Sequence, residues 1–255
     1  MTFPFDITIN LDQSNIAGVQ NRTIKINGGI TTFLGPNGSG KTQLLRGLKR
    51  SLNSHLNEKK IRYISAGRLG PMENFRSDYD GQRGMPRFEN ATFGDKTATS
   101  RRHQTETILG DFATLSERPD ILIKVQDRLR KLFKRDIIID WDGGNLKVFF
   151  ARVDQENTSN YSSAREASGL LHLVAMLSAL YDDEVGCLLI DEPEVSLHPQ
   201  LQSFLLSEII KVAGANTEQG KKLIFISTHS TEFIELSSVE QLSCIVFCKD
   251  ILTDP

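Results

Sequence analysis

The chain alternates apolar and polar side chains in two segments near its N-terminus, and longer apolar runs follow further along. A period of two over residues 3–11 and 21–27 predicts two half-buried strands that pair as an antiparallel flank. Continuous apolar runs predict buried strands over residues 30–34, 60–65, 187–190, 222–227 and 242–247. Buried strands separated by helical patterns are typical of an α/β protein, so we expect a mixed sheet at the core.

Helical patterns occupy much of the chain between these strands. Leucines recur on one face after the first buried strand, which predicts a helix from Lys41 to about Leu56. The same spacing predicts helices over residues 105–115, 119–133, 168–180 and 200–212. Ser168 begins the third of these segments and is predicted to be its N-cap.

Two further features indicate how the chain is divided. The segments 137–141 and 146–153 are joined by Asp142-Gly143-Gly144-Asn145, a sequence that favours a hairpin. Residues 67–106 are polar, rich in Gly, Pro, Asn and Asp, and show little periodicity, which indicates a long loop. We therefore expect one two-lobed domain over residues 1–255. Its lobes are a core of about 1–66 with 182–255, and a helical lobe of about 67–181.

Charge gives no signal for a nucleic-acid partner. At 255 residues, with 24% charged residues and a formal net charge of −2, the chain has no overall basic field. Arginines and aromatic residues are interleaved within residues 68–102, a pattern that can bind single strands. Acidic residues nearly balance the bases there, which favours a solvated loop. Nucleic-acid binding therefore stays open and is not predicted.

The cysteines and the apolar runs bear on the compartment. Three cysteines without regular spacing argue against a disulfide framework and for a reducing compartment. Cys244 and Cys248 have no second pair or nearby histidine to complete a metal site, so we expect both to be buried. No run approaches the ~20 apolar residues that span a bilayer, and the N-terminus lacks a basic segment followed by an apolar run. We expect a soluble, cytoplasmic protein with no membrane partner.

The most specific motif is an eight-residue segment that fills every fixed position of the phosphate-binding pattern G-x-x-x-x-G-K-[ST]. Its sequence is Gly35-Pro36-Asn37-Gly38-Ser39-Gly40-Lys41-Thr42. Glycines let successive backbone N–H groups turn onto phosphate oxygens, the lysine reaches the terminal phosphates, and the hydroxyl holds Mg²⁺. A predicted strand precedes the motif and a predicted helix follows it, so the sequence predicts a nucleotide site.

Two carboxylates and a histidine follow later buried strands. One apolar run is followed directly by Asp191 and Glu192, and the next ends close to His229. The aspartate is then placed beside the Mg²⁺ held by Thr42, and the glutamate can orient or deprotonate an attacking water. Because strand ends surround the nucleotide in an open α/β sheet, His229 is predicted to reach the same site.

In their order along the chain, these motifs resemble those of ABC-type ATPases. The shared segments are the phosphate loop, Ser168-Gly169, Leu188–Pro193, Ser196–Pro199 and Thr228–Ser230. The sequence Asp191-Glu192-Pro193-Glu194 is most similar to the AAA family ATPases of the OLD and RecF/SMC type, which act in DNA repair, chromosome maintenance and anti-phage defence. The resemblance covers nearly the whole chain. It implies a P-loop NTPase fold with an ABC-ATPase-like mixed sheet core, an antiparallel β flank and a helical subdomain.

The resemblance also implies a role for each residue of the nucleotide site. Lys41 binds the phosphates of ATP, and Thr42 and Asp191 hold Mg²⁺. Glu192 is the general base of ATP hydrolysis, and His229 senses the γ-phosphate.

For Ser168 and Gly169 the resemblance implies a contact with ATP bound to a second copy of the chain. The family therefore implies a head-to-tail homodimer that closes on two ATP molecules. It further implies a partner activity, either a separate effector protein or an effector region beyond Pro255.

Two departures separate the chain from membrane transporter subunits. The signature segment is Ala167-Ser168-Gly169-Leu170-Leu171 instead of Leu-Ser-Gly-Gly-Gln, and Arg68 stands near the place of the Q-loop glutamine. A transporter's ATP-binding subunit is therefore disfavoured. A nucleotide-gated scaffold with little turnover stays open as the alternative. The short stretch between Thr42 and Asp191, with Pro71 and many glycines, excludes long coiled-coil arms.

Overall fold

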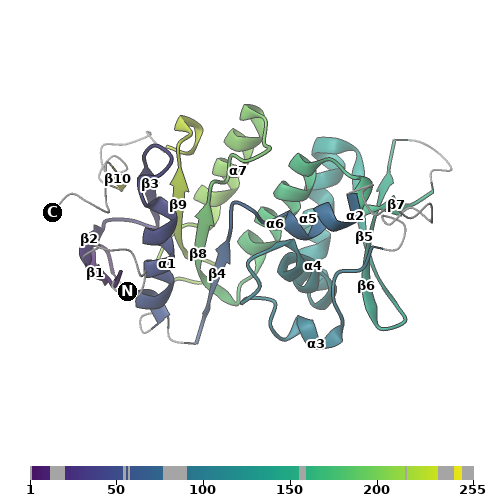
Figure 1. Ribbon diagram of the computed structural model, residues 1–255, viewed down its shortest axis with the longest axis horizontal. Helices are drawn as coiled ribbons and strands as arrows, with labels where there is room; N and C mark the ends of the chain where they lie inside the picture. The colour runs from purple at the N-terminus through teal and green to yellow at the C-terminus, as the bar shows by residue number, and fades with distance from the viewer. Residues whose placement is uncertain are drawn as a thin grey trace. The chain divides into compact units, whose positions relative to one another are not determined.

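The computed structural model describes most of the chain (Figure 1). The described residues are 2–11, 21–53, 56, 58–76, 91–154, 159–215, 217–234 and 244–248. They belong to two compact units. The first unit contains the chain up to Ala66 and again from Asp183, and the second unit is Gly67–Asp182.

The first unit is built on a parallel sheet with the strand order β10-β3-β9-β8-β4. The strands are β3 (Ile30–Leu34), β4 (Lys60–Ile64), β8 (Val185–Asp191), β9 (Leu223–Thr228) and β10 (Ile245–Phe247). Leu34 lies opposite Thr228, and Asp191 lies opposite Ser227. The carboxyl ends of β3, β8 and β9 therefore meet at one edge, where open α/β sheets bind their ligands.

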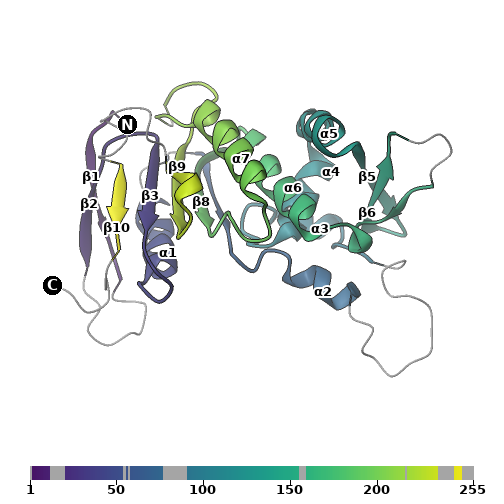
Figure 2. The same cartoon turned by 90° about the horizontal axis from the view of Figure 1, so that it is seen from above.

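Helices cover both faces of this sheet. Figure 2 shows α1 (Lys41–Leu52) and α7 (Pro199–Val212) on opposite sides of it. The apolar face of α1, with Leu44, Leu45 and Leu48, packs into a buried cluster. The strands contribute Phe33 of β3 and Phe225 of β9 to the same cluster. The helix ends at Leu52, earlier than predicted, although Leu56 still lies in the same cluster.

The predicted antiparallel flank is present in the first unit. β1 (Phe5–Ile9) pairs with β2 (Arg22–Ile26), and the side chains of Ile7 and Ile9 are buried. Gly47 of α1 permits the close approach of β1, because a Cβ at position 47 would lie 2.5 Å from Cγ2 of Ile9. A larger residue at this position would force the strand and the helix apart.

The second unit combines helices with a small antiparallel sheet. Its helices are α2 (Gly70–Arg76), α3 (Lys96–Thr99), α4 (Ile108–Glu117), α5 (Pro119–Phe133) and α6 (Ser168–Tyr181). Its strands are β5 (Arg135–Asp142), β6 (Asn145–Arg152) and β7 (Tyr161–Ser162). Residues 170–180 of α6 are all buried, and α6 packs against α4 and α5. A helix that is apolar on every side is a core helix, so α6 is the centre of this unit.

The long elements of the second unit agree with the sequence prediction, and the short ones do not. α5 has the predicted bounds, and the predicted hairpin of β5 and β6 is confirmed. The segment predicted to be a loop contains the short helices α2 and α3, while residues 77–90 within it lie outside the described residues. The four residues of α3 are held by Asp95, whose side chain accepts hydrogen bonds from two backbone N–H groups. So short a helix has no apolar stripe that periodicity could detect.

Cys244 and Cys248 are buried, as predicted, and both are free thiols. In the part of the chain that the structure describes, no helix combines the length and the apolar character needed to cross a membrane.

Candidate functional site

The segment 35–42, which matches the phosphate-binding pattern, connects the end of β3 to the start of α1, as predicted. Gly38 and Gly40 have φ angles of 83° and 85°, a region that glycine enters without strain. Gly35 is held close to Cys248, because a Cβ at position 35 would lie 2.3 Å from the Cys248 carbonyl oxygen. The glycines of the motif are therefore required by the backbone path of the loop.

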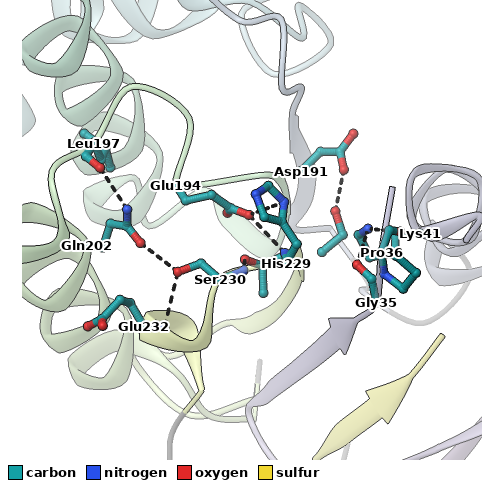
Figure 3. A network of polar contacts seen from close by, with 12 residues as sticks. Gly35, Pro36, Lys41, Asp191, Glu194, Leu197, Gln202, His229, Ser230 and Glu232 are labelled. Carbon is teal, nitrogen blue, oxygen red and sulfur yellow. Dashed lines mark hydrogen bonds and ion pairs between the residues drawn. The ribbon is translucent and has the colours of Figure 1, made fainter. Parts of the chain in front are cut away.

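Lys41 lies at the first turn of α1 and points back into the loop (Figure 3). Its Nζ donates hydrogen bonds to the carbonyl oxygens of Gly35 at 2.7 Å and Pro36 at 2.8 Å. The residue is only 5% exposed. Both acceptors are neutral carbonyl oxygens, so neither of them cancels the positive charge of the ammonium group, which lies within the loop.

Asp191, at the end of β8, accepts hydrogen bonds from three hydroxyl groups. Thr42 Oγ1 lies 2.9 Å from Oδ2, Tyr63 Oη lies 3.1 Å from the same oxygen, and Ser227 Oγ donates to Oδ1. Burial and the charge of Asp191 raise the pKa of the Tyr63 hydroxyl, with Arg46 acting in the opposite direction. Tyr63 therefore remains a hydrogen-bond donor to the carboxylate at neutral pH.

Glu192 shares a cavity of about 290 Å³ with the phosphate loop. The cavity is lined by Asn37, Gly38, Gly40, Lys41, Thr42, Gln43 and Glu192. Glu192 has a φ angle of 48°, and its N–H donates to the Ser227 carbonyl at 2.9 Å. A positive φ outside glycine costs on the order of 1 kcal/mol, and such residues cluster at functional sites.

His229 follows β9 and lies against Glu194 (Figure 3). Glu194 Oε1 accepts a hydrogen bond from the backbone N–H of His229 at 3.0 Å and lies 3.0 Å from Nδ1 of its ring. Beside this pair, Gln202 of α7 donates to the Leu197 carbonyl at 2.8 Å and accepts from Ser230 Oγ at 2.9 Å. The loop after β8 and the loop after β9 are therefore tied together by two separate links.

Ser168 and Gly169 lie at the start of α6, in the second unit, and both are half-buried. The prediction that Ser168 caps this helix is wrong. Ala167 occupies the N-cap position with extended angles of φ −63° and ψ 138°, and Ser168 is the first helical residue. The Ser168 hydroxyl is thus not required as an N-cap.

The loop before α6 is held by Glu166. Its Oε1 accepts the N–H of Ala167 at 2.8 Å, and its Oε2 accepts the hydroxyl of Tyr161. Burial and this hydrogen bond raise the pKa of Tyr161 to about 12. Arg68, at the place where a Q-loop glutamine would be expected, is fully buried in the second unit.

The donor groups of the first unit fit a nucleotide with its magnesium ion. Glycine N–H groups and a lysine suit phosphate, and a hydroxyl with a carboxylate suits Mg²⁺, which often binds through one carboxylate and substrate phosphates. Among the described residues there is no group of three or more His, Cys, Asp or Glu side chains that could hold a metal ion.

Solved structures are similar to this chain. A head domain of SMC bound to the C-terminal winged-helix domain of ScpA has a TM-score of 0.51 at 11% identity, covering 96% of this chain and 94% of that one. A dimeric post-hydrolysis state of the ATP-binding cassette MJ0796, bound to ADP and phosphate, has a TM-score of 0.46 at 15% identity, covering 96% and 92%. At such low identity the likeness to the SMC head concerns the fold alone.

Sequence comparison gives the family. No curated protein matches the chain. The family described as "AAA domain, putative AbiEii toxin, Type IV TA system" matches residues 86–235, more than half of the chain. The matched region contains Ser168, Asp191, Glu192 and His229, and the phosphate loop precedes it. The chain therefore belongs to this AAA family, and its fold is that of an ABC/AAA-like P-loop ATPase.

Proposed function

We propose that the chain binds ATP with Mg²⁺ and hydrolyses it to ADP and phosphate. The observation that carries this proposal is the meeting of Lys41, Thr42 and Glu192 at one cavity, with Asp191 hydrogen-bonded to Thr42. These groups come from segments far apart in the sequence and have complementary roles in phosphoryl transfer.

The phosphate loop and Lys41 bind the phosphates. The ammonium group of Lys41 donates to two neutral carbonyls, and a phosphate oxygen is a stronger acceptor because it carries a negative charge that attracts the ammonium group. The positive end of the α1 dipole points toward the same place. We therefore expect the Lys41 side chain to exchange a loop carbonyl for a phosphate oxygen when ATP binds.

Thr42 and Asp191 hold the magnesium ion. The Thr42 hydroxyl can offer a lone pair to the metal while it donates its proton to Asp191. Bound Mg²⁺ would supply positive charge that offsets the charge developing on the phosphate oxygens. Tyr63 and Ser227 keep the carboxylate of Asp191 in one orientation for this purpose.

Glu192 is the proposed general base, because it lines the cavity beside the phosphate loop and is an acidic residue. It would accept a proton from the water that attacks the γ-phosphate. His229 is proposed to contact the γ-phosphate itself, through the edge of its ring that faces away from Glu194.

Phosphate release by the purified protein tests this function. We expect release that depends on ATP and Mg²⁺ and stops when EDTA removes the metal. Tight ATP binding without turnover would instead favour the nucleotide-gated scaffold. Failure to bind ATP at all would reject both functions.

We further propose that two copies close head-to-tail on two ATP molecules, with Ser168 and Gly169 of one copy completing the site of the other. The support is that α6 begins at Ser168, whose hydroxyl lies at the positive end of a buried helix without serving as its N-cap. Such a group is suited to an anionic phosphate from a second copy.

Replacing Ser168 by alanine should weaken ATP-induced dimerisation about tenfold, the effect of one hydrogen bond to a charged group. ATP binding to the monomer should not change. Analytical ultracentrifugation with and without ATP measures the dimer, and Ser207→Ala, an exposed serine of α7, is the matched control. Equal ATP-induced dimerisation in Ser168→Ala and Ser207→Ala would contradict the proposed contact.

The closing motion is proposed to gate a partner activity in anti-phage defence or DNA maintenance. The support is the family description, which names a toxin of a Type IV TA system. Loss of the γ-phosphate on hydrolysis is a common means of releasing such a switch. Capture of bound proteins from the native host, with hydrolysis blocked and ATP present, tests for the effector.

A further inference from the structure

A single oxygen of Glu194 holds both the backbone and the ring of His229. The Glu194 side chain is 7% exposed, whereas the side chain of His229 is 51% exposed. The buried carboxylate thus contacts the inner, Nδ1 edge of the ring, and the outer edge remains accessible to a ligand.

The carboxylate has no other hydrogen-bond partner in the part of the chain that the structure describes. Its second oxygen, Oε2, is buried and accepts no hydrogen bond there. Burial of a carboxylate costs free energy unless pairing compensates for it, and a purely stabilising role would engage both oxygens. The contact that the Glu194 carboxylate makes in this loop is therefore the one with His229.

The backbone around Glu194 is also fixed. The Leu197 N–H donates to the Glu194 carbonyl at 2.9 Å, and Gln202 joins Leu197 to Ser230, the residue after His229. Glu194 is therefore held on a braced turn, and its carboxylate can impose a direction on the ring of His229.

We propose that Glu194 is a positioning residue that holds the Nδ1 edge of the His229 ring and turns Nε2 toward the γ-phosphate, an inference that rests on the proposed ATP site. A carboxylate only accepts hydrogen bonds, so the contact with Nδ1 keeps a proton on that nitrogen. Nε2 is then the ring atom turned toward the ligand. A hydrogen bond to an ionised phosphate oxygen requires a proton on Nε2 as well, and the carboxylate of Glu194 then balances the charge of the ring.

Nuclear magnetic resonance of the histidine ring nitrogens tests the tautomer without nucleotide. The chain has five histidines, and His229→Asn identifies the signals of the relevant ring. We expect a proton on Nδ1 in the wild type and in Glu194→Gln, whose amide oxygen still accepts a hydrogen bond. Glu194→Ala should lose this preference. An unchanged ring spectrum in Glu194→Ala would overturn the proposal whether or not the protein binds ATP.

Nucleotide affinity tests the consequence for the ligand. Glu194→Ala should weaken ATP binding about tenfold and leave ADP binding unchanged, because only ATP has the γ-phosphate. Glu194→Gln should weaken ATP binding less. This variant also allows the affinity to be measured if the alanine variant fails to fold. Glu232→Ala is the matched control, since that carboxylate accepts a hydrogen bond from Ser203 of α7 instead.

Different results would reject ATP binding and the role of Glu194. If the wild type does not bind ATP, the proposed function is rejected. If the wild type binds ATP and folded Glu194→Ala and Glu194→Gln keep the same ATP-to-ADP preference, only the role of Glu194 is rejected.

Discussion

Replacing Glu192 by glutamine should lower ATP turnover by at least about 10²-fold, the usual contribution of a general base, while ATP binding persists. Glutamine has nearly the same size, so the wall of the cavity and the turn at positive φ should be retained. Its amide cannot take the proton of an attacking water. Phosphate release and the binding of a fluorescent ATP analogue measure the two effects separately.

The control for this change is Glu218→Gln, which removes the same charge at an exposed turn of the first unit. It should leave both turnover and binding at wild-type values. Near-normal hydrolysis by Glu192→Gln would show that another group activates the water.

Replacing Lys41 by alanine should lower ATP affinity about 10²-fold, because the loop loses the ammonium group that bonds charged phosphate oxygens. The side chain is buried, so the variant should also lose some thermal stability, because the packing of the lysine side chain is removed. Equilibrium binding of ATP to the variant measures the effect, and the melting temperature shows whether the variant is folded.

Lys25→Ala is the matched control for charge, since Lys25 is an exposed lysine of β2 in the same unit. It should bind ATP as the wild type does. If a folded Lys41→Ala protein retains wild-type affinity, the phosphate site is not at residues 35–42.

The phosphate loop could be predicted from sequence because its requirements are local. Glycines at 38 and 40 are needed by backbone angles, and Lys41 and Thr42 follow at fixed spacing. The placement of Asp191 at a strand end was also predictable, because the apolar run of the buried strand stops where the first charged residue follows it. Both features are properties of a short contiguous segment.

Tyr63 and Ser227 could not be found in this way. They meet Asp191 because β4 and β9 are the two neighbours of β8 in the sheet. Periodicity identifies strands without giving their lateral order, so no pattern along the chain links these residues. The one available signal was a hydroxyl-bearing side chain next to the last residue of each strand.

The cap of α6 and the partner of His229 were missed for a different reason. Whether Ala167 or Ser168 is the cap depends on which residue has extended backbone angles, and serine is compatible with both positions. Glu194 was recognised as part of a motif, but its contact with His229 joins two loops that follow different strands. Such contacts depend on tertiary packing.

The strand order also has a consequence for how the protein folds. β9 lies between β3 and β8, although it follows both in the sequence. In the complete sheet, Thr42 and Asp191, which are 149 positions apart, therefore meet beside the strand that is synthesised last of these three. During synthesis, a chain that has not yet emerged beyond residue 228 cannot form the complete sheet beside this site. Because a ligand stabilises only the conformation that binds it, ATP with Mg²⁺ should favour the finished sheet over partly folded chains.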